Sequence, residues 1–146
     1  MTATTGTRTQ AGLASGLRSA LMRLNRRLRY ESSDQRLTPN QLAVLGTLNR
    51  NGTLTVGALA AHEQVQPPSM TRIVSGLEQL GLVQRSPDES DRRVTWISLT
   101  DDGHDTIARF RRQRTAWLDR QLGALTAEER ATLRAAVPVL EKISTL

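Results

Sequence analysis

The chain has 146 residues, enough for one compact domain, and a net charge of +6 from 20 basic and 14 acidic residues. The sequence has no cysteine and only two histidines, so a disulfide framework, a thiol sensor and a recognisable metal motif are excluded. No signal peptide and no membrane-spanning apolar run is found. We therefore expect a cytoplasmic protein with no cofactor and no membrane contact, and the basic charge favours a polyanionic partner.

The basic charge is unevenly placed along the chain. Residues 1–36 contain seven arginines against two acidic residues, whereas residues 64–99 contain four of each. Net charge alone therefore does not locate a surface for a polyanion.

The first part of the chain predicts a tail followed by an amphipathic helix. Residues 1–11 are small, polar and aperiodic, which is typical of a disordered tail. Leucines then recur at helical spacing from Leu13 to Leu28, with arginines off the apolar stripe. We expect this helix to end near Tyr30.

Three helices are predicted next, and the last two form a helix-turn-helix. The first runs from Thr38-Pro39 to Gly52, the second is short and covers 56–63, and the third covers 67–80 and stops before a glycine. The apolar positions of the third helix are expected to be buried: Met70, Ile73, Val74, Leu77 and Leu80.

A hairpin and two further helices complete the chain. Strand-like runs over 82–86 and 94–99 flank a charged turn, and two capped helices follow, from Thr100 and from Thr126. The fold class is thus mainly α with a small β-hairpin wing. It consists of a winged helix-turn-helix lobe over 38–99 and a helical dimerisation region over 12–37 and 100–146.

The outward face of the helix 67–80 suits the major groove of DNA. Small hydrogen-bonding side chains and one long cation leave base edges accessible, while two prolines remove backbone donors that could anchor a phosphate. The alternative is an ordinary amphipathic helix of an all-α protein. The candidate DNA contacts on this helix are Pro68, Ser69, Thr71, Arg72 and Ser75.

The turn over 87–93 places Arg92 and Arg93 on a projecting loop beside acidic residues. A guanidinium fits the narrow, negative minor groove, and Asp91 can hold one arginine in an extended pose. The alternative is a solvated charged turn. Asp91, Arg92 and Arg93 are the candidate wing contacts.

These motifs resemble those of MarR-family regulators over roughly residues 13–146. Three runs are similar to the family's wing and to the helix start after it: GLVQR (81–85), DRR (91–93) and LTDDG (99–103). Two runs are similar to its helix-turn-helix: PSMTR (68–72) and LEQLG (77–81). The resemblance implies a sequence-specific, dimeric transcriptional regulator, more often a repressor. Ser69, Thr71 and Arg72 would enter the major groove and Arg92 the minor groove. Pro68 and Pro138 depart from the pattern.

The helices at the two ends of the chain carry apolar stripes that the lobe does not need. They either wrap the lobe or pair with a second copy, and the resemblance implies a homodimer. Its two recognition helices would lie about 34–36 Å apart, on a near-palindromic operator. The candidate dimerisation residues are Leu13, Leu17, Leu21, Leu133, Val137 and Leu140.

The resemblance also implies release from DNA by a small aromatic or anionic effector, bound between the dimerisation helices and the lobe. Solvated arginines and packed tryptophans are the alternative. The candidate ligand-binding residues are Arg18, Arg23, Tyr30, Trp96 and Trp117.

Two other classes of protein compete with a DNA-binding regulator. The zero net charge of residues 64–99 favours a winged-helix protein-interaction module without sequence-specific DNA binding. An enzyme is not expected, because no nucleophile–base constellation, metal motif or phosphate-binding glycine loop is found.

Overall fold

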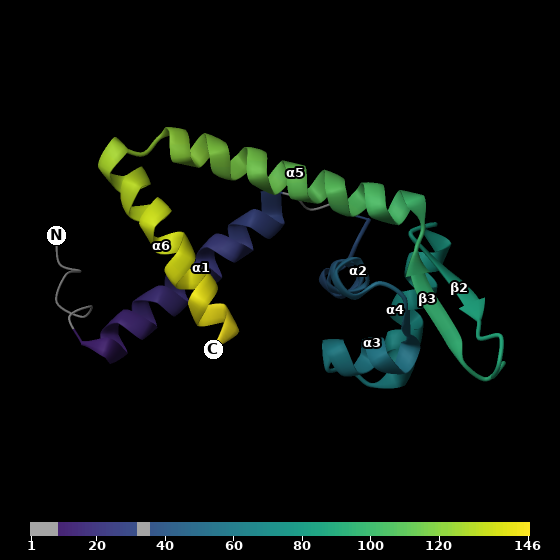
Figure 1. Ribbon diagram of the computed structural model, residues 1–146. Coiled ribbons are helices and arrows are strands. Elements are labelled where there is room, and N and C mark those ends of the chain that lie inside the picture. Colours follow the sequence, from purple (N-terminus) through teal and green to yellow (C-terminus); the bar gives the residue numbers. More distant parts are fainter. Residues whose placement is uncertain (1–8, 32–35) are drawn as a thin grey trace. The chain divides into compact units, whose positions relative to one another are not determined.

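The computed structural model describes residues 9–31 and 36–146 and confirms the predicted fold class (Figure 1). The described chain forms two compact units: the winged lobe, residues 36–112, and the helical unit, residues 9–31 with 113–146. The elements are α1 (Gln10–Glu31), α2 (Pro39–Asn51), β1 (Leu54–Thr55), α3 (Val56–Glu63), α4 (Pro67–Gln79), β2 (Val83–Pro87), β3 (Thr95–Leu99), α5 (Asp101–Gly123) and α6 (Ala127–Thr145).

Helix α1 begins earlier than the sequence pattern predicts. Its first residue, Gln10, falls inside the span 1–11 that was expected to be a tail, of which residues 1–8 lie outside the described chain. Thr9 explains the difference, because its side-chain oxygen accepts a hydrogen bond from the backbone N–H of Gly12 at 3.1 Å. Such a bond satisfies a helix N–H that has no partner within the helix.

The predicted helix caps of α2 and α6 are confirmed, and α3 is capped by a threonine in the same way. Thr38 and Thr126 each begin a capping box, with Gln41 and Glu129 respectively as the third helical residue. Thr55 accepts a hydrogen bond from the backbone N–H of Ala58 and so starts α3. These local hydrogen bonds place the helix starts where the sequence predicts them.

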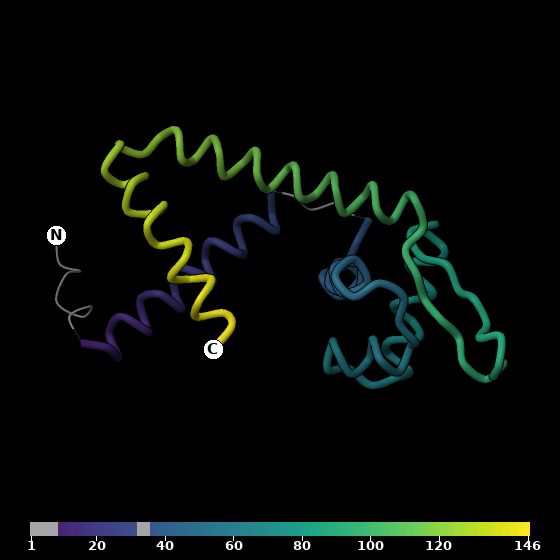
Figure 2. The backbone as a smooth tube through the Cα atoms, viewed as in Figure 1, coloured from purple at the N-terminus to yellow at the C-terminus, as the bar shows by residue number. Residues whose placement is uncertain are grey.

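The sheet has three antiparallel strands in the order β1-β3-β2. Strands β2 and β3 form the predicted hairpin, visible as a continuous loop of chain in Figure 2, with Arg85 opposite Ile97. Strand β1 was not predicted, and it pairs Leu54 with Ile97 on the other edge of β3. It attaches the chain just before α3 to the central strand of the wing.

The core of the winged lobe lies between α2, α3, α4 and the sheet. Its largest fully buried side chains are Leu45, Leu48, Leu59, Met70, Leu77, Ile97, Val44 and Val74. The expected burial of α4 is therefore confirmed for Met70, Val74 and Leu77, and Ile73 packs partly against this core. It is wrong for Leu80, which is 40% exposed because α4 ends at Gln79 and the chain reverses direction through Gly81 at φ +72°.

The start of α5 is held tightly against the turn after α4. The Thr100 hydroxyl donates to the carbonyl of Gly81 at 2.6 Å and accepts from the backbone N–H of Gly103 at 3.1 Å. Gly103 leaves no room for a side chain, since a Cβ there would collide with the carbonyl oxygen of Leu82. The helix after the wing is thus anchored beside the end of α4.

Among the helices described, none is both long and apolar enough to cross a lipid bilayer.

Candidate nucleic-acid interface

The turn between α3 and α4 sets the direction of the second helix of the helix-turn-helix. Gln64 ends α3 in the left-handed conformation, at φ 54°. The backbone N–H of Val65 then donates to the carbonyl of Ala60 at 3.0 Å. Two residues later α4 begins at Pro67, so the chain changes direction over a short and well-bonded connection.

A buried polar contact holds α3 against α2. The Thr47 hydroxyl donates to the Glu63 carboxylate at 2.5 Å and accepts from the Arg50 guanidinium at 3.1 Å. Thr47 is buried, so these bonds satisfy a hydroxyl that water does not reach. Sequence reasoning missed this contact, because Thr47 lies on the apolar face of α2.

The candidate contacts on α4 differ in how far their polar atoms are already bonded. Pro68, Ser69, Thr71 and Arg72 are exposed, on the face opposite the buried Met70. The Thr71 hydroxyl donates to the Pro67 carbonyl at 3.0 Å and so retains only its acceptor capacity and its methyl group.

The side chains of Arg72 and Ser69 make no hydrogen bond or ion pair with any described residue. They therefore have polar atoms free for a ligand.

Arg85 connects the wing to α4. Its Nε lies 2.9 Å from Oε2 of Glu78, and a terminal guanidinium nitrogen donates to the Ser75 hydroxyl at 3.0 Å. Ser75, a predicted DNA contact, is thus half-buried and engaged by an arginine of β2. The sequence motif includes Arg85, but the pairing joins two elements and could not be inferred from spacing.

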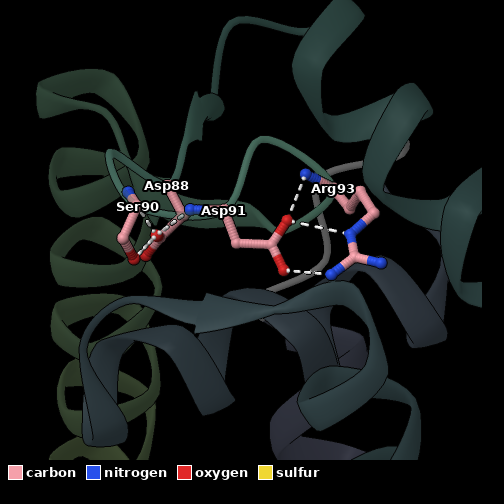
Figure 3. A network of polar contacts seen from close by, with 4 residues as sticks. All are labelled: Asp88, Ser90, Asp91 and Arg93. Atoms are coloured by element: carbon pink, nitrogen blue, oxygen red, sulfur yellow. Dashed lines mark hydrogen bonds and ion pairs between the residues drawn. The ribbon is translucent and has the colours of Figure 1, made fainter.

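The turn of the wing, residues 88–94, is organised by the carboxylate of Asp88. Its Oδ1 accepts from the Ser90 hydroxyl at 2.6 Å and from the backbone N–H groups of Ser90 and Asp91, each at 2.9 Å (Figure 3). Its Oδ2 accepts from the Trp96 indole N–H at 2.8 Å. The Ser90 hydroxyl, followed by the indole N–H, therefore holds the pKa of Asp88 well below its usual range.

Asp91 pairs with Arg93 through two parallel contacts, as the sequence predicts for one of the two arginines. The Arg93 Nε and a terminal nitrogen each lie 3.0 Å from a different carboxylate oxygen, and the Arg93 backbone N–H also donates to Oδ1 (Figure 3). The Arg93 side chain lowers the pKa of Asp91, and Asp91 in turn raises the pKa of Arg93. Arg92, between them, is exposed and unpartnered among the described side chains.

Two ion pairs account for half of the eight charged residues in 64–99. Glu78 and Asp91 neutralise Arg85 and Arg93, while Asp88 holds the turn. The remaining arginines of this span, Arg72 on α4 and Arg92 on the wing, keep their charge available. A span with zero net charge therefore still presents two guanidiniums that no described acid pairs with.

The predicted ligand residues are distributed over both units. Trp96 belongs to the winged lobe, where it lines a hollow of about 390 Å³ with Pro87, Asp88, Glu89 and Ser90. The other four belong to the helical unit, in which Trp117 is buried and Tyr30 is 73% exposed. Arg18 contacts the sulfur of Met22 at 3.8 Å.

Together these features define a winged helix-turn-helix DNA-binding protein. The MarR family model matches residues 37–95. The HTH-type transcriptional regulator Mb0904 of Mycobacterium bovis is 40% identical over 89% of this chain and 91% of its own length. The HTH-type transcriptional repressor MdtR of Bacillus subtilis is 39% identical, over 65% of this chain and 61% of its own.

A solved MarR family protein from Bacillus stearothermophilus is 29% identical, with a TM-score of 0.76 over 95% of this chain and 97% of that one. The chain belongs to the MarR family. It is a DNA-binding transcriptional regulator and not an enzyme. The predicted family and class of function are thus confirmed, and the alternative of an interaction module is not favoured.

Proposed function

We propose that this regulator represses transcription as a homodimer on a near-palindromic operator, with α4 in the major groove and the turn of the wing in the minor groove. The observation that carries this proposal is the pairing of the lobe's arginines. Two of the four arginines in residues 64–99 pair with acids. The other two are Arg72, which lies on α4, and Arg92, which lies on the turn of the wing. The name of the relative MdtR supports repression.

The chemistry of α4 supports base reading by a few side chains. A free guanidinium at Arg72 can bond two acceptors of a guanine in the major groove. Ser69 can donate or accept, whereas Thr71 offers an acceptor and a methyl group, since its hydrogen is bonded to Pro67. The two prolines at the start of α4 lack N–H groups, so phosphate contacts fall to side chains.

The wing supports contact with the minor groove through Arg92. Asp91 and Arg93 hold each other, so they shape the turn, and Arg92 is left to reach outward. A cation at the tip of such a turn is attracted by the strong negative potential of a narrow minor groove.

The helical unit supports a dimer through apolar residues that the protomer leaves uncovered. MarR family members bind DNA as dimers, and within the described protomer neither α1 nor α6 has a buried residue. Exposed apolar residues gathered on two helices indicate an interface. Among the candidates, Leu13 is 56% exposed, Leu21 45%, Leu133 46% and Val137 51%.

Release by a small aromatic anion stays a proposal based on family resemblance. Arg18, Arg23, Tyr30 and Trp117 of the helical unit are the candidates for this contact, and Trp96, which belongs to the winged lobe, is a separate candidate. A shift in thermal midpoint with salicylate as the probe, lost in Arg23→Ala, is the expected result.

In vitro selection of DNA from a random pool tests the proposed function directly. We expect a near-palindromic consensus whose half-sites are about one helical turn apart, since a two-fold dimer presents two equivalent α4 helices. The matched control is the Arg72→Ala/Arg92→Ala variant, for which no consensus should emerge. Failure of the unmodified protein to enrich any sequence would instead support a protein-interaction module.

A further inference from the structure

Trp96 links the central strand of the sheet to the turn of the wing. It lies on β3, where it is paired with Ser86 of β2 and Thr55 of β1. Its ring is half-buried, and its indole N–H donates to Oδ2 of Asp88 at 2.8 Å. A side chain from the most firmly paired strand therefore reaches the carboxylate on which the turn is built.

The carboxylate of Asp88 is bonded on both oxygens, and by different parts of the chain. Oδ1 accepts three hydrogen bonds from Ser90 and Asp91, all within the turn. Oδ2 accepts the one hydrogen bond that comes from the sheet, that of Trp96. The backbone bond from Asp88 to Val94 holds the base of the turn, and the bond from Trp96 fixes the orientation of the Asp88 carboxylate relative to β3.

The position of Arg92 depends on this turn. Arg92 follows Asp91 directly and has no side-chain partner in the described chain, so only the backbone orients it. The base of the turn is closed by Val94, whose N–H donates to Asp91 at 2.9 Å and whose carbonyl accepts from Asp88 at 3.0 Å. A change in the orientation of Asp88 would therefore be transmitted to Arg92.

We propose that Trp96 is a positioning residue of the wing, which acts through Asp88 to present Arg92 to the minor groove. The contact between Arg92 and DNA in this inference rests on the proposed function. The hydrogen bond from Trp96 to Asp88 does not depend on it. Trp96 acts here through its N–H, whereas a wall of a ligand site or a packing residue would act through its ring. Trp96→Phe separates the two roles, because it keeps an aromatic ring and removes the donor.

A double-mutant cycle on operator affinity is the main test. Trp96→Phe should weaken specific binding about three- to tenfold, close to the worth of one hydrogen bond. The same substitution in the Arg92→Ala background should have no further effect, because nothing remains to be positioned. Gln84→Ala, on β2 at the end of the hairpin away from the turn, is the matched control and should bind as the unmodified protein does.

Equal losses in the two backgrounds would show a general structural effect and overturn the proposal, as would unchanged affinity in Trp96→Phe. Thermal unfolding of each variant verifies that the fold is kept.

Amide hydrogen exchange of the free protein tests the hydrogen bond without DNA. The N–H groups of Ser90 and Asp91 should exchange faster in Trp96→Phe and at the normal rate in Gln84→Ala. Unchanged exchange in Trp96→Phe would overturn the inference. If exchange rises in Trp96→Phe while Arg92→Ala binds the operator normally, the link between Trp96 and the turn is supported. The minor-groove contact of the proposed function is then contradicted.

Discussion

At the scale of single residues, two acids of the lobe engage two of the four arginines in residues 64–99. Glu78 and Asp91 engage Arg85 and Arg93 at 2.9 and 3.0 Å, and these pairs fix how the two guanidinium groups are oriented. Because both pairs are exposed to solvent, we attribute to them orientation of the surface and little stability.

Gly103→Ala is expected to destabilise the protein. The added Cβ would meet the Leu82 carbonyl, which is backbone and cannot move aside without shifting the turn after α4. Overpacking of this kind costs about 1–3 kcal/mol in the free energy of unfolding. Urea denaturation at fixed protein concentration measures it.

Gly123→Ala is the control for that substitution, since the space around Gly123 is open and alanine favours a helix. It should leave stability unchanged or slightly higher. If Gly103→Ala were as stable as this control, α5 would not be in close contact with Leu82.

The sequence predicts which residue types face DNA, but not which of them are already bonded. Spacing on α4 placed Ser75 beside Arg72 on one face, yet Ser75 is bonded to Arg85, ten residues further along the chain. A contact between two elements has no signature in either element's periodicity. The Asp91–Arg93 pair, by contrast, is local, and the sequence predicts it.

At the scale of elements, helix caps are the most predictable features from the sequence. Short strands at the edge of the sheet and the last residues of helices are the least predictable. The capping boxes at Thr38 and Thr126 depend on residues three apart, so they can be read from the sequence. Strand β1 has two residues and no alternating pattern, and it exists only because β3 has a free edge beside it. Leu80 continues the apolar stripe of α4 although the helix has ended.

The order of the wing should not depend on pH near neutrality. The pKa of Asp88 is lowered in the folded chain, so its contribution is complete above the unfolded pKa and is lost as the pH falls through the folded one. The indole N–H resonance of Trp96 should therefore stay constant in NMR spectra from neutral pH down to about pH 4, the ordinary range of an aspartate. Titration of this resonance between about pH 5 and 7 would contradict the hydrogen bond to Asp88.

Arg92→Ala should weaken operator binding by about tenfold or more, roughly 1.4 kcal/mol, while the dimer persists. The loss follows from removing a cation that no acid of the described chain neutralises. Fluorescence anisotropy at moderate salt measures it, with Arg120→Ala, on α5, as a control for net charge. Specific binding that survives Arg92→Ala would show that the wing does not enter the minor groove.

At the scale of the whole molecule, the helical unit has apolar surface that a lone protomer leaves in water. The amphipathic stripe predicted for α1 is present, but no residue of α1 is buried within the described protomer. Periodicity reveals such a stripe without revealing what covers it, which is why the partner could not be derived from the sequence pattern alone.

Replacing Leu17 and Leu21 by Asp is expected to give monomers or insoluble chain, because charges would then occupy the interface. Analytical ultracentrifugation measures the mass. Ser15→Asp, on the same helix but off the stripe, should remain a dimer. A stable monomer that still binds the operator would contradict the proposed interface.

The central claim is that Arg72, which pairs with no described acid, reads a base from α4. It is tested most directly by Arg72→Ala, measured against a panel of operators that each differ by one base pair. We predict a loss of discrimination at one base pair in each half-site, worth about 1–3 kcal/mol, with the preferences at other positions retained. A uniform loss across all sequences, with a shallower dependence on salt, would make Arg72 a phosphate contact and contradict base reading by α4.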